Sequence, residues 1–299
     1  MSRRLGLLAC VFGMLLALAP GSAAAASHAR PAQLYVSLGD SYASGFQPSG
    51  VGGVGKNTRN GFAYQVAPIA AQRGYRLKLV NFGCGGATTA SLIQRKGCPR
   101  TALGPGGRSY PHQTQLAAAE TFLRAHRRQT ALATVSISGN DVTACTRASD
   151  PVSCVATATT TIKKNVTAIA RGLRRAAGPK VRIVGTTYPD VILGAWVNGD
   201  SASQSLASLS VVAFKSLINP TLKKAYASAH ARFVDVTSVS GSYIPFSQTT
   251  TLFPYGTVPV AVERICELSY FCAFHDIHLR TDGYHLIADL VARQLPRRH

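Results

Sequence analysis

The stretch LYVSLGDS (residues 34–41) joins a short apolar run to a glycine, an acid and a hydroxyl. Similar short apolar runs recur at residues 77–82, 132–137, 181–187 and 232–236. Longer helix-like stretches lie between and after them, at residues 62–73, 113–128, 156–177, 203–229 and 281–295. Short buried strands that alternate with helices predict a parallel sheet with helices on both faces. The sequence therefore indicates an α/β fold, and one domain accounts for it.

Polar or glycine-rich motifs follow the first three predicted strands directly. Gly39-Asp40-Ser41 follows the first, GCGGATT (residues 83–89) the second, and SGND (residues 138–141) the third. Each motif alone has a structural explanation as a helix cap or tight turn. Because ligands in open parallel sheets bind at the carboxyl ends of the strands, we expect the three motifs to lie together.

A fourth motif, HDIH (residues 275–278), comes just before the last predicted helix. It places a base and a carboxylate a few residues apart. An isolated histidine carries little information about function. The role of the HDIH motif therefore has to be inferred from the order of all four motifs along the chain.

In this order the motifs resemble those of the SGNH (GDSL-type) hydrolase family, over nearly the whole chain after residue 39. The resemblance implies a flavodoxin-like three-layer α/β/α sandwich with a mostly parallel five-stranded sheet, and hydrolysis of acyl esters. It makes Ser41 the nucleophile and His278 the base. The oxyanion hole would consist of the Ser41 N–H, the Gly86 N–H and the Asn140 side-chain amide. Gly85 is the alternative to Gly86.

The acid of the catalytic set departs from the family pattern, in which an Asp usually stands three residues before the His. That position is His275 here, and Asp276 stands two residues before His278. Three hypotheses stay open: Asp276 reaches His278 through an altered loop, a backbone carbonyl near His275 replaces the acid, or Asp282 and His285 form the true pair. We take Asp276 as the catalytic acid.

The N-terminus is typical of a secretory signal peptide. Arg3 and Arg4 precede an apolar core at residues 5–19, and small residues follow. We expect residues 1–26 to be the signal peptide, residues 27–299 to be the catalytic domain, and the protein to be secreted. No later segment looks apolar for long enough to span a membrane.

The chain has seven cysteines, of which Cys10 lies in the predicted signal peptide. An even number in an exported protein indicates disulfides. Six cysteines allow fifteen connectivities, and their spacing in three local pairs favours Cys84–Cys98, Cys145–Cys154 and Cys266–Cys272. A zinc site is the less favoured alternative, because the sequence has no C-x-x-C pair.

The net charge of +20 favours anionic partners, such as a membrane or cell-wall surface, without indicating specific nucleic-acid binding. We expect a monomer that needs no metal or other cofactor. The segment at residues 239–274 is rich in aromatic residues, which are either packed against one another or form the wall of an apolar cleft.

The preferred function is that of a lipase or carboxylesterase. Alternatives on the same fold are a phospholipase or an acetyl-polysaccharide esterase. Two other classes remain: a basic exported protein that binds anionic polymers, and a metal-dependent phosphoesterase with ligands among Asp40, Asn140, Asp141, His275 and His278.

Overall fold

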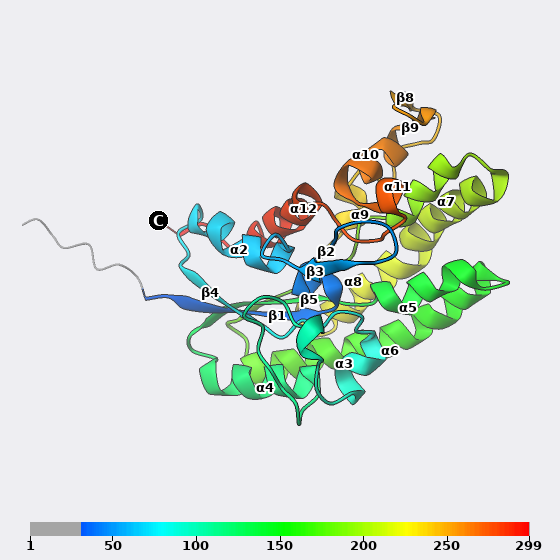
Figure 1. Cartoon of the computed structure of the whole chain (residues 1–299). Helices are drawn as coiled ribbons and strands as arrows, with labels where there is room; N and C mark the ends of the chain where they lie inside the picture. The colour runs from blue at the N-terminus through cyan, green and yellow to red at the C-terminus, as the bar shows by residue number, and fades with distance from the viewer. Residues whose placement is uncertain (1–30, 299) are drawn as a thin grey trace, which may run out of the picture. The chain divides into compact units, whose positions relative to one another are not determined.

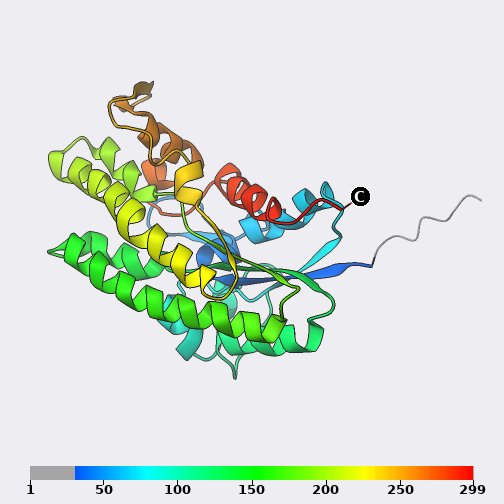
Figure 2. The same ribbon diagram turned by 180° about the vertical axis from the view of Figure 1, so that it is seen from behind.

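Five parallel strands form the central sheet of the computed structural model, which describes residues 31–298 (Figures 1 and 2). In their order across the sheet they are β4 (Leu77–Asn81), β1 (Gln33–Gly39), β5 (Thr130–Ser136), β6 (Arg182–Thr186) and β7 (Arg232–Val234). Each strand coincides with one of the five predicted runs. All seven residues of β5 are buried, as expected for a central strand covered on both faces.

Helices cover both faces of the sheet, which confirms the predicted three-layer fold (Figure 1). On one face α2 (Phe62–Ala71) packs against α12 (Thr281–Ala292). On the other, α6 (Pro151–Ala177) packs between α4 (Gln115–His126) and α8 (Asn219–Ala227).

The strand order reverses at β1, because the chain adds β4 on one side of it and β5 on the other. In a flavodoxin-like sheet, ligands bind at the carboxyl ends of the two strands that flank such a switch point. Ser41 follows β1 and Asn140 follows β5. The fold therefore brings the first and third motifs to one crevice.

The carboxyl end of β1 lies against β5 with no room for a side chain. Gly39 has φ +141°, and a Cβ there would lie 2.0 Å from the carbonyl oxygen of Ser136. The next residue, Asp40, donates its N–H to that same oxygen at 3.1 Å. Gln115 accepts the Gly39 N–H at 2.7 Å and donates to the Gly39 carbonyl at 3.0 Å. Gly39, the first residue of the Gly-Asp-Ser motif, is thus fixed by its contact with β5 and by both hydrogen bonds to Gln115.

Further short elements lie at the strand ends and in the connections. They are α1 (Ser41–Ser44), β2 (Phe46–Pro48), β3 (Gly55–Asn57), α3 (Thr89–Gln94), η1 (Arg100–Ala102), α5 (Gly139–Thr143), η2 (Ala144–Arg147), η3 (Val191–Asn198), α9 (Val236–Val239) and α11 (Phe271–Phe274).

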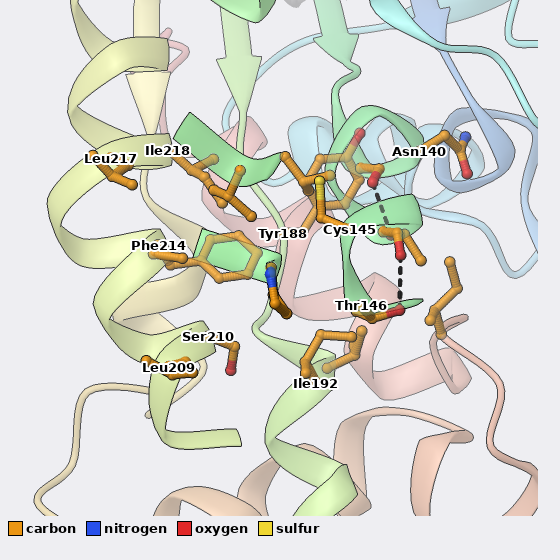
Figure 3. A pocket seen from close by; sticks show the side chains of 18 of the residues that line it. Asn140, Cys145, Thr146, Tyr188, Ile192, Leu209, Ser210, Phe214, Leu217 and Ile218 are labelled. Atoms are coloured by element: carbon orange, nitrogen blue, oxygen red, sulfur yellow. Dashed lines mark hydrogen bonds between the residues drawn. The ribbon is translucent and has the colours of Figure 1, made fainter. Parts of the chain in front are cut away.

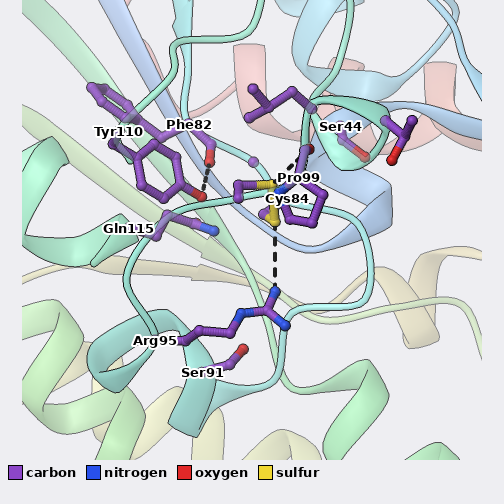
Figure 4. The surroundings of a disulfide bond; sticks show 12 residues. Ser44, Phe82, Cys84, Ser91, Arg95, Pro99, Tyr110 and Gln115 are labelled. Atoms are coloured by element: carbon purple, nitrogen blue, oxygen red, sulfur yellow. Dashed lines mark hydrogen bonds between the residues drawn. A yellow bond between two sulfur atoms is a disulfide. The ribbon is translucent and has the colours of Figure 1, made fainter. Parts of the chain in front are cut away.

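The structure contains all three predicted disulfides. Cys84–Cys98 ties down the loop after β4, where the guanidinium of Arg95 lies 3.8 Å from the Cys84 sulfur (Figure 4). The other two are Cys145–Cys154, which joins η2 to the start of α6, and Cys266–Cys272. Each closes a short loop, a constraint worth about 2–3 kcal/mol on loop-entropy grounds.

A single helical run, Ser201–Ala227, connects η3 to β7. It consists of α7 (Ser201–Ala213), the π-helical turn η4 (Phe214–Ile218) and α8. The turn comes just before Pro220, which has no N–H to donate to a carbonyl one turn earlier. By length and apolar composition this run could span a membrane, so the expectation that no later segment could do so is wrong on those measures. A core helix passes the same test, and α7 and α8 pack against η3 and α6.

The segment at residues 239–274 is more regular than the sequence indicated. It contains the hairpin of β8 (Thr249–Leu252) and β9 (Gly256–Pro259), followed by α10 (Val260–Leu268). On α10, the side chains of Ala261, Val262 and Ile265 are buried. The segment therefore has its own hairpin and helix, with part of that helix buried.

The predicted signal peptide lies outside the described residues. All of residues 31–298 belong to one compact unit.

Replacing Gly39 by alanine is expected to destabilise the fold by at least about 3 kcal/mol, since the new methyl group overlaps the Ser136 carbonyl and φ +141° disfavours any side chain. The matched control is Gly50→Ala, because a Cβ at Gly50 meets nothing within 4 Å. Urea unfolding followed by circular dichroism measures both. Equal stability of the two variants would contradict this account of the β1–β5 contact.

Candidate active site

Ser41 is the first residue of α1, and its side chain is almost fully buried at 8% exposure. The helix starts here because Asp40 caps it: Oδ1 of Asp40 accepts the N–H of Tyr42 at 2.9 Å. As in the first turn of any helix, the Ser41 N–H has no partner within the helix, and among the described residues it makes no other hydrogen bond.

Asp40 also accepts a hydrogen bond from the hydroxyl of Tyr188, at 2.5 Å from Oδ2. Burial raises the pKa of Asp40 to about 6, although the hydrogen bonds from Tyr188 and from the Tyr42 N–H act to lower it. Tyr188 comes two residues after β6, and its ring leaves only 3.1 Å for a Cβ at Gly139. This tyrosine therefore connects the ends of β1, β5 and β6.

His278 lies in the loop between α11 and α12, and Asp276 fixes its orientation. Oδ1 of Asp276 lies 2.6 Å from Nδ1 of His278 and accepts the backbone N–H of the same histidine at 2.9 Å. Tyr42 donates its hydroxyl to the carbonyl of Ile277 at 2.6 Å, and the ring of Phe46 lies 4.5 Å from the His278 ring, centroid to centroid. Nε2 of His278 is buried and has no hydrogen-bond partner among the described residues.

The geometry favours the first of the three hypotheses for the acid, since Asp276 is the residue whose side chain lies against Nδ1 of His278. Asp276 reaches His278 across a two-residue spacing because one carboxylate oxygen serves both the ring and the backbone of the histidine. Burial acts to raise the pKa of Asp276, but the hydrogen bonds and charge of His278 outweigh it, so that the pKa lies below its usual value. Asp282 and His285 are both exposed on α12, and His285 pairs with Gln65 at 2.9 Å. They are not the pair beside Ser41.

The two adjacent glycines after β4 differ in the use of their N–H groups. The Gly85 N–H is taken up by the carbonyl of Ala102 at 2.8 Å. The Gly86 N–H makes no hydrogen bond within residues 31–298, and φ +75° turns the backbone at this position. The Asn140 amide donates one hydrogen to the carbonyl of Ala87 at 2.9 Å, which leaves its second hydrogen available. Gly86 is therefore the better donor of the two glycines.

Asp141 is engaged in hydrogen bonds with Thr89. Its carboxylate accepts the hydroxyl of Thr89 at 2.5 Å and the N–H of Thr89 at 2.9 Å, and so joins α5 to α3. This bonding occupies one of the acids considered as a metal ligand. Across residues 31–298, no three His, Cys, Asp or Glu side chains come together in a metal-ligand cluster.

Two hollows meet at Ser41, and Asn140 lines both. The first, here called the groove, is lined by Ser41, Phe46, Asn57, Gly86, Asn140 and His278 together with residues of η1. The second, here called the apolar pocket, lies between α5, η2 and the start of α6 on one side and α7 with η4 on the other (Figure 3). Tyr188, Val155, Leu209, Phe214 and Ile218 are among its lining residues.

The aromatic residues of segment 239–274 line neither hollow. They pack against η3 and against one another: Phe246 lies 5.1 Å from Trp196 of η3, and Tyr270 stacks on Phe274 at 5.4 Å, centroid to centroid. The interpretation of this segment as the cleft wall is wrong, because the wall comes from the helices after β5 and β6.

Sequence reasoning missed three residues that hold the site together: Gln115, Tyr188 and Tyr42. For Tyr188 a signal existed, since it follows the fourth predicted strand as the other motifs follow the first three. Nothing local to Gln115 or Tyr42 distinguishes them, because their partners lie 76 and 235 residues away in the chain.

Comparison with known proteins gives the class. The sequence model of the family GDSL-like Lipase/Acylhydrolase matches residues 35–291. The chain belongs to this family and is an ester hydrolase by class. No curated protein matches its sequence.

Three solved structures are similar to this chain at low sequence identity. A lipase from a goat rumen metagenome is 14% identical with a TM-score of 0.51, over 88% of this chain and 97% of the other. The aryl esterase of M. smegmatis is 13% identical with a TM-score of 0.44, over 88% and 98%. A carbohydrate acetylesterase from Sinorhizobium meliloti is 13% identical with a TM-score of 0.45, over 88% and 97%. At these identities the first similarity shows the fold alone.

Replacing Asp40 by asparagine is expected to change how stability depends on pH. The unfolded chain releases the Asp40 proton near pH 4 and the folded protein near pH 6, so between these values only the folded state holds it. The stability that this protonation contributes is complete below about pH 4 and is lost as the pH rises to about 6, a change of about 3 kcal/mol.

Urea unfolding of the native protein and of Asp40→Asn, across about pH 4 to 7, measures the difference. We expect the stability of the native protein relative to the variant to fall by about 3 kcal/mol over this range. The control is Asp282→Asn, at an exposed aspartate of α12. A stability difference between the native protein and Asp40→Asn that does not vary with pH would contradict the shifted pKa.

Proposed function

We propose that the chain is an exported serine carboxylesterase or lipase in which Ser41 is the nucleophile, His278 the general base and Asp276 the orienting acid. One observation carries this proposal. His278 shares the groove with Ser41, its Nδ1 lies 2.6 Å from Asp276, and its buried Nε2 has no hydrogen-bond partner within residues 31–298. A nitrogen kept in this state is available to take a proton from a hydroxyl in the same groove.

In the first half of the reaction, Ser41 Oγ bonds to the carbonyl carbon of the ester while its proton passes to His278 Nε2. The bond from that carbon to the alcohol oxygen then breaks, and His278 gives the proton to the departing alcohol. In the second half, a water molecule gives a proton to His278 as its oxygen bonds to the acyl carbon. The bond to Ser41 Oγ breaks, Ser41 regains the proton, and the carboxylic acid leaves.

Negative charge develops on the carbonyl oxygen in both halves. The available donors are the N–H groups of Ser41 and Gly86 and the second amide hydrogen of Asn140. Their fixed positions stabilise this charge without reorganisation, and each such donor is typically worth about 100- to 1000-fold in rate. Asp276 keeps a proton on Nδ1 of His278 and stabilises the imidazolium that forms, because its own lowered pKa keeps it ionised.

Export rests on the N-terminal sequence and on the cysteines. Residues 1–26 have the pattern of a cleaved signal peptide, which leaves residues 27–299 as the catalytic domain. Three disulfides in one small domain favour an oxidising compartment outside the cytosol. The net charge of +20 favours association of a monomeric enzyme with anionic membrane or wall surfaces.

Replacing Ser41 by alanine is expected to abolish hydrolysis of p-nitrophenyl acetate, because the acyl group then has no oxygen to bind to. Ser205→Ala, on the exposed side of α7, is the matched control and should keep full activity. Circular dichroism checks that both variants fold. In addition, a fluorophosphonate probe should label the native protein and the Ser205→Ala variant but not Ser41→Ala. Equal turnover by both variants would remove Ser41 from the mechanism.

Replacing Asp276 by asparagine is expected to lower kcat by about 1000- to 10,000-fold, because the His278 ring is then held in the wrong tautomer. The control is Asp282→Asn, which tests the alternative acid and should leave kcat within about twofold, in line with a surface substitution. Steady-state kinetics with p-nitrophenyl acetate measures both. If Asp282→Asn were the damaging substitution, the acid would have been assigned to the wrong residue.

A further inference from the structure

The groove and the apolar pocket differ in one residue that matters for the reaction. Ser41 and Asn140 line both hollows, whereas His278 lines the groove alone. An ester bound at Ser41 has two arms, the acyl chain and the alcohol. The position of His278 distinguishes the hollows, and so distinguishes the two arms.

The proton that leaves with the alcohol comes from His278, so the alcohol oxygen must lie within hydrogen-bond reach of Nε2. That places the alcohol arm in the groove, which is lined by Phe46, Asn57 and the η1 residues Thr101 and Ala102. The acyl arm extends from the other side of the same carbonyl carbon. It therefore points away from His278, into the apolar pocket.

Ser41 and Asn140, which the apolar pocket shares with the groove, are polar groups at its inner end. The threonine and serine hydroxyls farther along its described lining bond within the protein: Thr143 donates to the carbonyl of Gly139 at 2.8 Å, Thr146 to that of Thr143 at 2.9 Å, and Ser210 to Asp190 at 2.8 Å. The Tyr188 hydroxyl bonds to Asp40. What remains on the walls is apolar, from side chains such as those of Phe214 and Ile218 (Figure 3). Only an apolar group gains by entering.

The mouth of the pocket is apolar as well. Among the residues that the structure describes, eight large apolar side chains are exposed, and three of them, Val152, Leu209 and Val212, line this pocket. Val152 belongs to α6, while the other two belong to α7 on the opposite wall. A chain longer than the pocket can therefore continue over apolar surface.

We propose that the apolar pocket binds the acyl chain, and that the substrates are esters of medium- and long-chain fatty acids whose alcohol lies in the groove. This rests on the proposed function for the assignment of His278 as the proton donor. Each methylene buried in the pocket should raise kcat/KM by about threefold to fourfold, the equivalent of about 0.8 kcal/mol, until the pocket is full.

The test fills the pocket from α7 with Ala213→Phe. The matched control is Ala202→Phe, the same change on the same helix at an exposed position outside the pocket. Three substrates separate the arms of the ester: p-nitrophenyl dodecanoate has a long acyl chain, dodecyl acetate has a long alcohol, and p-nitrophenyl acetate has neither. We expect Ala213→Phe to lose at least about tenfold in kcat/KM on the dodecanoate alone.

Other outcomes overturn the proposal. A loss on dodecyl acetate alone would place the alcohol in the apolar pocket, and an equal loss on all three substrates would show a general defect rather than a lost subsite. Native kcat/KM that is highest for acetate would exclude long acyl chains as the preferred substrates. Should Ala213→Phe fail to fold, Leu209→Trp at the exposed rim takes its place, with the same expectations.

A binding measurement tests the pocket independently of turnover. Dodecanoate should bind the Ser41→Ala variant in isothermal titration calorimetry with a negative heat-capacity change, the mark of apolar burial. Adding Ala213→Phe to that variant should weaken binding by at least about tenfold, and adding Ala202→Phe should not. If the variant binds dodecanoate in this way but the native protein hydrolyses no ester, the pocket assignment holds and the proposed function is refuted. Binding that Ala213→Phe leaves unchanged would refute the pocket.

Discussion

The close approach of Gly39 to the carbonyl of Ser136 is the contact on which the rest of the site depends. Because no side chain intervenes, the end of β1 lies directly against the end of β5, and the same carbonyl accepts the N–H of Asp40. Gln115 occupies both backbone groups of Gly39 and so prevents the strand end from turning. Ser41 and Asn140 therefore keep their relative positions although they follow different strands. Donors that are fixed before the substrate arrives are what stabilisation of an oxyanion requires.

The histidine reaches this site by two independent means. Its orientation is local, since Asp276 bonds to both the ring and the backbone of His278. Its position is tertiary, since the hydroxyl of Tyr42 holds the carbonyl of Ile277 at 2.6 Å. Tyr42 is the residue after Ser41, so the loop that carries His278 is attached to the helix that begins at Ser41. The arrangement requires a buried carboxyl, because Asp40 caps that helix. Burial disfavours its ionised form and raises its pKa to about 6.

The parts of this structure that could be predicted are those whose signals are local in the sequence. Each strand is a short apolar run, and the motifs at the strand ends follow it directly in the sequence. Both the sheet and the crevice at its carboxyl edge could therefore be predicted. The acid remained open because a two-residue spacing works only if the loop turns suitably, and the left-handed backbone of His275 just before Asp276 is not visible in a sequence. The choice between Gly85 and Gly86 depended on a carbonyl of η1. The aromatic content of residues 239–274 was compatible both with mutual packing and with a cleft wall, and only the tertiary contacts of these side chains could decide between the two.

The apolar character of the helical run Ser201–Ala227 has a functional explanation. One side of this run packs on η3 and α6, and other residues of α7 and η4 line the apolar pocket, so both its inner and its outer positions carry apolar side chains. A run with two apolar surfaces meets the same criteria of length and composition as a membrane span. The run lies in the connection between β6 and β7, whereas Ser41, Asn140 and His278 lie elsewhere in the chain. With the apolar pocket assigned to the acyl chain as proposed, changes along α7 alter which acyl chain is accepted without moving Ser41, Asn140 or His278, so that the substrate can change while the chemistry stays the same.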